Sequence, residues 1–275
     1  ANSTDKDKLR VVYGAILNNI ATQGDFSDLI NREYIEEQSN PVRGGTVVVK
    51  KYKYPTVRNY GTARAAGAGD SMQNNGVSVK IDSDKEIVEE VEKKDLDLGE
   101  PMLLAKRSVD VSTSMNAFLD DAYFVALQTA AATFDTSSYS GIQNKLLALI
   151  RHAESQTGDN VKKIPRALMV VTLAPEFWDA LLTYTQSLPN PYNGGVDARF
   201  FHGVEIRPAV RQDVDAVIQV RGAMALPVVI DNYVAGRIQL SNALAHELYF
   251  SYGVKAVRSE TIFKAALSTD NDISI

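Results

Sequence analysis

Apolar and polar residues follow helical spacing in some parts of this chain and strand-like alternation in others. Between residues 99 and 134, apolar positions recur at helical spacing and predict one long helix. β-Branched and hydroxyl residues at 109–114 predict a break within it, where Thr113 or Ser114 would cap the second piece. Shorter helical patterns predict helices at 9–20 and 26–35.

The second half of the chain alternates helices with short strands. We expect a helix at 142–153 that Gly158 closes, a buried strand at 167–173, and a helix that begins at Pro175. Further strands are predicted at 203–207, 216–220, 226–230, 237–240 and 247–257, before a short apolar piece at 262–267. The pattern as a whole predicts an α+β protein.

Residues 41–97 form what we call the arm, which has the pattern of a projecting β-hairpin. A β-branched, aromatic and basic strand is predicted at 46–58, and an alternating return strand at 77–81. The tip between them, residues 59–76, is rich in Gly, Ala, Asn and Ser. We expect no apolar face on this hairpin that its own chain could bury. An isolated hairpin is marginally stable and exposes strand edges, so we expect a neighbouring copy of the chain to cover it.

Charge changes sign along the arm. The chain of 275 residues is 45% hydrophobic and 23% charged, and its net charge of −5 argues against wrapping nucleic acid as a main activity. Arg43 and five further cations precede an acidic run, and opposite charges of this kind could join one subunit to another. The alternative is two solvated surfaces without a partner. The candidate contact residues are Lys50, Lys51, Lys53, Arg58, Arg64, Glu86, Glu89, Glu90 and Glu92.

Catalytic and metal-binding patterns are weak in this sequence. It has no cysteine, and His152, His202 and His246 are scattered without metal-ligand spacing. We expect all three histidines to be structural or surface residues, with His152 solvated. The string GDSM at 69–72 is similar to a lipase motif but lacks the partner Asp-x-x-His. We therefore expect no enzyme, no cofactor and no metal site. No apolar run reaches the ~18 residues that span a bilayer, so no membrane partner is expected.

The order of these parts resembles the major capsid proteins of tailed double-stranded DNA phages, which have the Hong Kong 97 fold. The strings VSVKIDSDKEI at 77–87 and KDLD at 94–97 look like a hairpin return into the family's spine helix. Residues 165–175 (PRALMVVTLAP) and 177–182 (FWDALL) are similar to its axial-domain strand and helix. FHGVEIR at 201–207 is similar to its return strand after a flexible loop.

The resemblance implies a fold and its division into parts. These are an N-terminal arm at 1–40, the β-hairpin arm at 41–97, a peripheral domain with the spine helix at 98–138 and 246–275, and an axial domain at 139–245. The flexible loop that would face the symmetry axes consists of Asn190, Pro191, Tyr192, Asn193, Gly194 and Gly195.

The resemblance also implies a function. The chain would assemble as pentamers and hexamers into an icosahedral virion shell, formed in the host cytoplasm around packaged double-stranded DNA that it contacts non-specifically. A portal would be a partner, with scaffold or decoration proteins as further candidates. Encapsulin compartments, which hold enzymes, share the fold and are the first alternative. A soluble hydrolase or ligand-binding domain is the alternative from a different class.

Overall fold

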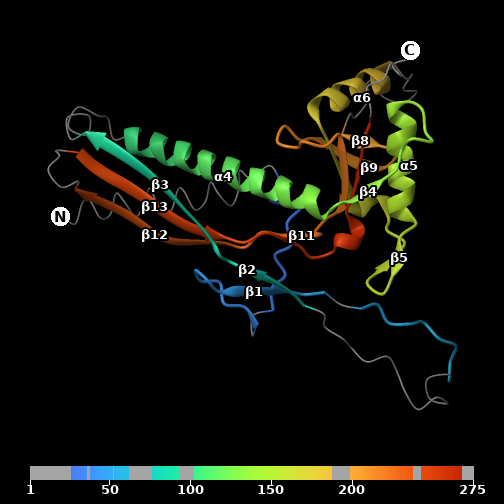
Figure 1. Ribbon diagram of the computed structural model, residues 1–275, viewed down its shortest axis with the longest axis horizontal. Helices are drawn as coiled ribbons and strands as arrows, with labels where there is room; N and C mark the ends of the chain where they lie inside the picture. The colour runs from blue at the N-terminus through green and yellow to red at the C-terminus, as the bar shows by residue number, and fades with distance from the viewer. Residues whose placement is uncertain are drawn as a thin grey trace.

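One long helix, α4 (Met102–Ala130), extends along two separate sheets (Figure 1). The computed structural model describes residues 26–35, 38–51, 53–61, 76–92, 102–187, 199–237 and 243–267. The predicted long helix is confirmed, but the predicted break at 109–114 is wrong. Ser112 Oγ and Thr113 Oγ1 both donate hydrogen bonds to the carbonyl oxygen of Val109, at 3.0 and 2.8 Å. The hydroxyl groups are thus satisfied within the helix instead of interrupting it.

A six-stranded sheet lies at the C-terminal end of α4. Its strand order is β4-β15-β10-β7-β9-β8. The strands are β4 (Ala132–Phe134), β15 (Phe263–Ala265), β10 (Ala216–Val220), β7 (Met169–Leu173), β9 (Val204–Pro208) and β8 (Phe200–Phe201). Because β4 pairs in parallel with β15, the chain is already extended at 132–134, where the sequence predicted helix.

Helices cover both faces of this sheet. Leu149 of α5 (Ile142–Glu154) and Phe177 of α6 (Pro175–Ser187) pack in one buried cluster with the β-strands. On the other face, Val170 and Val217 share a second buried cluster with Phe124 of α4. Buried on both faces, β7 has the continuous apolar sequence that predicted it.

A three-stranded antiparallel sheet, β12-β13-β3, runs beside the N-terminal part of α4 (Figure 1). Its strands are β12 (Val228–Arg237), β13 (Ala243–Tyr252) and β3 (Ser83–Glu92). The ring of Phe118 on α4 meets the rings of Phe250 and Tyr252 edge-on, at 6.2 and 5.6 Å. Two predicted strands fall on β12: it contains residues 228–230 of the predicted strand 226–230 and residue 237 of the predicted strand 237–240. Residues 238–240 lie outside the described residues.

Short strand pairs complete the described chain. β1 (Thr46–Val49) pairs with β2 (Val77–Lys80), and β11 (Met224–Ala225) pairs with β14 (Lys255–Ala256). β5 (Thr157–Gly158) and β6 (Val161–Lys162) form a small hairpin after α5. Two 3₁₀ turns, η2 (Arg166–Leu168) and η3 (Ser259–Thr261), precede β7 and β15.

Several sequence predictions are corrected by the structure. Residues 26–35 form no helix: a turn at 26–29 is followed by single bridges from Ile30 to Met224 and from Tyr34 to Val49. Gly158 does not close α5, which ends at Glu154, because Gly158 is part of β5. The predicted helix at 9–20, most of the arm tip and the loop 190–195 lie outside the described residues. The predicted domain boundaries stay a prediction.

Candidate intersubunit interface

The base of the arm is buried in its own chain, which corrects the expectation that the hairpin has no face for such burial. Val49 on β1 and Val79 on β2 lie on paired strands, where Val49 is opposite Val77 and Val79 is opposite Val47. Both are buried with Ala225 and Val257 of the main body. Burial of a valine side chain contributes about 1.5–3 kcal/mol, so the body itself stabilises this short ladder.

Polar contacts hold the same base in place. The amide of Gly44 donates to the carbonyl of Ile81 (2.8 Å), and the Ile81 amide donates to the carbonyl of Gly45 (2.9 Å). Arg43 Nη2 donates to Asp84 Oδ2 (2.7 Å), while Ser251 Oγ donates to Asp84 Oδ1 (2.7 Å). These bonds, first that of Arg43, lower the pKa of Asp84. The arm therefore leaves the body in a fixed direction.

Beyond β1, the predicted long strand at 46–58 is absent. We call residues 50–61 the outgoing segment. Its described residues, 50–51 and 53–61, form neither helix nor strand, and Tyr52 lies outside the described residues. Lys51 Nζ donates to Glu260 Oε2 (3.1 Å), and Lys53 Nζ lies 3.1 Å from Asp159 Oδ2. Two predicted intersubunit cations are therefore engaged within their own chain.

The other predicted cations have different positions. Lys50 follows β1 directly, and its amide donates to the carbonyl of Glu33 at 3.2 Å. Arg58 is exposed near the end of the outgoing segment, and Arg64 lies outside the described residues. Whether these cations contact a neighbouring copy stays a prediction.

The acidic candidates all lie on β3 but not on one face. Because side chains alternate along a strand, Glu86 and Glu90 share the face opposite to that of Glu89. Ile87, on the same face as Glu89, packs against the α4 cluster, so Glu86 and Glu90 belong to the outer face of the sheet. Val88 lies between them and is exposed. Glu92 ends the strand.

The partner strand extends this acidic outer face. Glu247 of β13 pairs in register with Val88, and Tyr249 with Glu86. The hydroxyl of Tyr249 donates to Glu247 Oε2 (3.0 Å). That bond, followed by burial and the Glu86 charge, raises the pKa of Tyr249. The outer face thus combines negative charge with an exposed valine and an aromatic ring.

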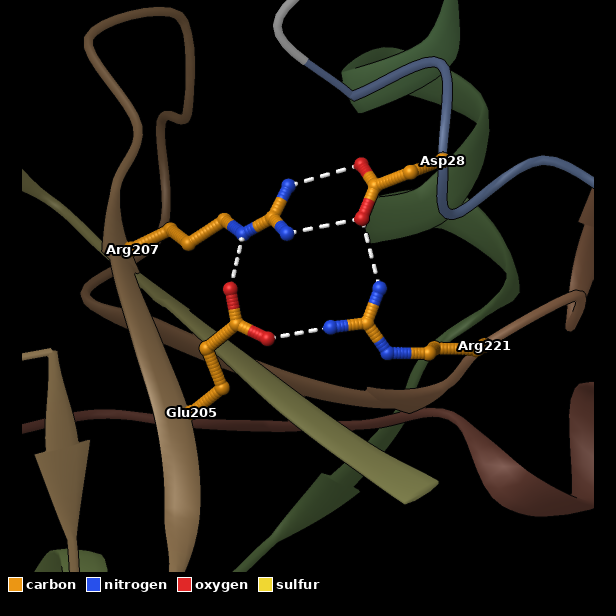
Figure 2. A network of polar contacts seen from close by, with 4 residues as sticks. All are labelled: Asp28, Glu205, Arg207 and Arg221. Atoms are coloured by element: carbon orange, nitrogen blue, oxygen red, sulfur yellow. Dashed lines mark hydrogen bonds and ion pairs between the residues drawn. The ribbon is translucent and has the colours of Figure 1, made fainter. Parts of the chain in front are cut away.

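A second charged network fastens the segment before the arm (Figure 2). Arg207 of β9 donates two bonds to the carboxylate of Asp28, at 2.8 and 2.7 Å, and one to Glu205 Oε1 at 2.7 Å. Arg221 bonds both Asp28 Oδ2 (2.5 Å) and Glu205 Oε2. These bonds, led by that of Arg207, lower the pKa of Asp28 to about 2 and raise the pKa of Arg207.

Apolar contacts complete this attachment. The ring of Phe26 meets that of Phe124 on α4 edge-on at 4.6 Å, and Leu29 is fully buried. The main-chain amide of Asn31 donates to the carbonyl of Met224 at 2.7 Å. Residues 26–31 are therefore an integral part of the body.

The described residues contain no group of three or more His, Asp or Glu side chains that could hold a metal ion. His152 is not solvated as predicted: its ring stacks on Phe134 (4.6 Å) and meets Phe263 edge-on (4.8 Å). His202 lies in the β8–β9 turn at a φ of 49°. The GDSM string at 69–72 lies outside the described residues. Among the described helices, none is long and apolar enough to cross a membrane.

Comparisons with known proteins agree on one fold. No family model matches the sequence, and no curated protein matches it. A solved chain of Mycobacterium phage Che8 is 21% identical with a TM-score of 0.60, covering 89% of this chain and 92% of that one. A capsid chain of the cyanophage P-SCSP1u is 12% identical with a TM-score of 0.61, covering 88% and 87%. This chain has the fold of tailed-phage major capsid proteins.

The capsid fold also occurs in a virus-like particle. A virus-like particle from Pyrococcus furiosus is 12% identical with a TM-score of 0.54, and the match covers 92% of this chain and 97% of that one. The likeness therefore extends over nearly the whole length of both chains.

Sequence reasoning missed two features of this capsid fold. Asp159 and Lys162 of the β5–β6 hairpin contact the outgoing segment, although they are far from it in sequence. Val57 and Tyr60 are 93% and 99% exposed. The only sequence signal for the second feature was two apolar residues in a segment otherwise rich in cations and turn formers.

Proposed function

We propose that this chain is a major capsid protein that self-assembles into an icosahedral shell around packaged double-stranded DNA. The observation that carries the proposal is the capsid fold shared over 88% of this chain and 87% of the cyanophage capsid chain. The role is structural rather than enzymatic, and its chemistry is the association of copies.

The charges and apolar groups outside the core supply the contact surfaces in this proposal. Lys50, Lys51, Lys53, Arg58 and Arg64 are the basic contacts, and Glu86, Glu89, Glu90 and Glu92 are the acidic ones. A lysine ammonium group has three donors, so Lys51 and Lys53 retain donors for a neighbour beside their own-chain partners. Complementary charges of this kind raise the rate of encounter and select the partner.

The parts of the fold take the roles expected of a Hong Kong 97 shell. α4 acts as the spine helix, residues 98–138 and 246–275 form the peripheral domain, and residues 139–245 form the axial domain. The loop 190–195 faces the symmetry axes of pentamers and hexamers. The shell assembles in the host cytoplasm with a portal, and scaffold or decoration proteins are further candidate partners.

An encapsulin-like compartment is the second candidate function, because the same fold also occurs in a virus-like particle from Pyrococcus furiosus. The two functions differ in what the shell contains. Particles purified from the producing organism and treated with nuclease should retain long double-stranded DNA if the chain is a phage capsid protein. Particles that hold protein instead of nucleic acid would favour the compartment.

Size-exclusion chromatography with light scattering, followed by negative-stain imaging, tests shell formation itself. We expect megadalton particles or capsomer rings of five or six. A stable monomer of about the chain mass of 30.1 kDa at high concentration would contradict the proposal. It would favour a soluble hydrolase or ligand-binding domain instead.

A deletion tests the part that the arm takes. Removing residues 59–75 shortens the hairpin but keeps Gly76, where a Cβ atom would approach Val48 Cγ1 to 2.5 Å. We expect a folded subunit, with the thermal unfolding of the full chain, that no longer assembles. Assembly at the normal rate after this deletion would remove the arm from the proposal.

A further inference from the structure

The β5–β6 hairpin grips the outgoing segment of its own chain. The amide of Tyr54 donates to the carbonyl of Asp159 (3.1 Å), whose carboxylate pairs with Lys53. Lys162 Nζ donates to the carbonyl of Pro55 (2.9 Å) and lies 5.8 Å from the centre of the Tyr54 ring. A main-chain bond, a charge-assisted bond, an ion pair and a cation–π contact thus meet within three residues of the segment.

A second contact holds the outgoing segment before this grip, two residues after the end of β1 at Val49. Lys51 pairs with Glu260 of η3, and the Lys51 side chain is only 15% exposed. The pair is therefore more shielded from solvent than Lys53–Asp159, whose side chains are 42% and 75% exposed. The Lys51–Glu260 pair fixes the start of the outgoing segment, and the β5–β6 hairpin fixes residues 53–55 that follow.

Apolar side chains follow directly beyond this grip. Val57 and Tyr60 are almost completely exposed, although both are residue types that gain free energy on burial. Tyrosine is also enriched among the residues that dominate protein–protein binding energy. The structure therefore separates a part of the arm held by its own body from a part that the body leaves uncovered (Figure 1).

We propose that Asp159 and Lys162 form a latch for the arm of their own chain, and that the latch presents Val57 and Tyr60 to a second copy of this protein. This inference rests on the proposed shell function. Holding the segment before association reduces the ordering cost that binding otherwise includes. The latch is thus a positioning device, and Val57 and Tyr60 are the anchors.

Charge complementarity identifies the occupant as a second copy. Residues 50–58 carry four cations and no acid, although two of the cations, Lys51 and Lys53, also pair with acids of their own chain. The outer face of β3 carries Glu86 and Glu90 on either side of exposed Val88, with Glu247 next to it on β13. A basic segment with apolar anchors matches an acidic surface with an apolar centre. One chain supplies both surfaces, so copies can join one after another.

Hydrogen exchange on unassembled subunits tests the latch. In the double variant Asp159→Ala/Lys162→Ala, amide exchange in residues 50–61 should become roughly fivefold faster, as expected for loss of about one net hydrogen bond. The thermal midpoint should not move. Lys163→Ala is the matched control, because Lys163 is the exposed lysine next to the hairpin and takes no part in the grip. Unchanged exchange in the double variant would overturn the latch.

Assembly followed by light scattering tests the presentation. The latch variant should assemble several-fold more slowly than the control, and Val57→Ser/Tyr60→Ser should lose assembly while its exchange in residues 50–55 stays normal. Normal assembly of the anchor variant overturns the role of Val57 and Tyr60, and normal assembly of the latch variant overturns the role of the grip. If the unmodified chain never assembles, both the shell function and the presentation of Val57 and Tyr60 to a second copy are overturned. The hydrogen-exchange experiment still tests whether Asp159 and Lys162 hold the arm.

Discussion

Gly253 lies so close to Lys80 that a Cβ atom at position 253 would be 2.9 Å from the Lys80 carbonyl carbon and would collide with its oxygen. The Gly253 amide donates to the carbonyl of Pro227 at 3.1 Å, so the glycine cannot simply move away. This close approach brings the turn after β13 against β2, and it joins the arm base to the three-stranded sheet.

Gly253→Ala should therefore lower the free energy of unfolding by about 2 kcal/mol or more, because main-chain atoms must shift to admit the methyl group. Urea unfolding followed by circular dichroism measures the loss. Gly158→Ala is the control, since a Cβ atom there would meet nothing within 4 Å. Equal stability of the two variants would contradict the close approach.

Substitution of two valines of the arm should change the free energy of unfolding by very different amounts. Val49 is fully buried, so Val49→Ala should cost about 2 kcal/mol in the free energy of unfolding. Val57→Ala should change stability by less than about 0.5 kcal/mol, because its side chain is exposed. Denaturant titration of both variants checks the difference. A large loss for Val57→Ala would mean that the segment packs against its own body.

A buried polar pair joins α4 to the six-stranded sheet. The hydroxyl of Tyr123 donates to Gln219 Oε1 at 2.7 Å, and burial raises the pKa of Tyr123. Tyr123→Phe should cost about 1–3 kcal/mol in the free energy of unfolding, because it leaves the Gln219 carbonyl buried without its donor. Gln219 Nε2 already has no hydrogen-bond partner among the described residues.

A double-mutant cycle separates this bond from packing. Tyr123→Phe/Gln219→Leu removes both polar groups and should recover much of the loss of the single variant. Strictly additive losses, measured by urea unfolding, would show that the two groups do not act as a pair.

The Asp28 network should make the attachment of residues 26–31 dependent on pH. The pKa of Asp28 in the folded chain is about 2, lowered from 3.8. The stabilising contribution of Asp28 is therefore complete above about pH 3.8 and is lost as the pH falls towards 2. The stability difference between the unmodified chain and Asp28→Asn should therefore be constant near neutral pH and vanish in strong acid. Because the carboxylate is partly exposed, high salt should reduce the difference.

Unfolding free energies measured in urea across this pH range check the prediction. Asp213→Asn is the control, because Asp213 is exposed and lies outside the network. A difference that persists unchanged at pH 2 would show that Asp28 acts through its shape rather than through its charge.

Local sequence was sufficient for elements whose pattern and environment agree. The helical spacing of 99–134 predicted α4, and the continuous apolar run of β7 predicted a strand buried on both faces. It was insufficient where a distant segment changes the outcome. The hydroxyls at 112–113 suggested a break, yet packing of Met115 and Leu119 into the core holds the helix straight through them.

The sequence by itself determined that the chain is an α+β protein with a long helix, a basic hairpin arm and an acidic segment after it, because periodicity and charge order are local properties. Only the tertiary structure decided which arm residues the body buries, that Asp159 and Lys162 hold the outgoing segment, and that Val57 and Tyr60 stay uncovered. Those facts depend on contacts between residues about a hundred or two hundred positions apart, such as Lys162 with Pro55 and Lys51 with Glu260. The free energy of such contacts arises only when two surfaces meet, so the sequence of one segment does not identify the segment that it contacts.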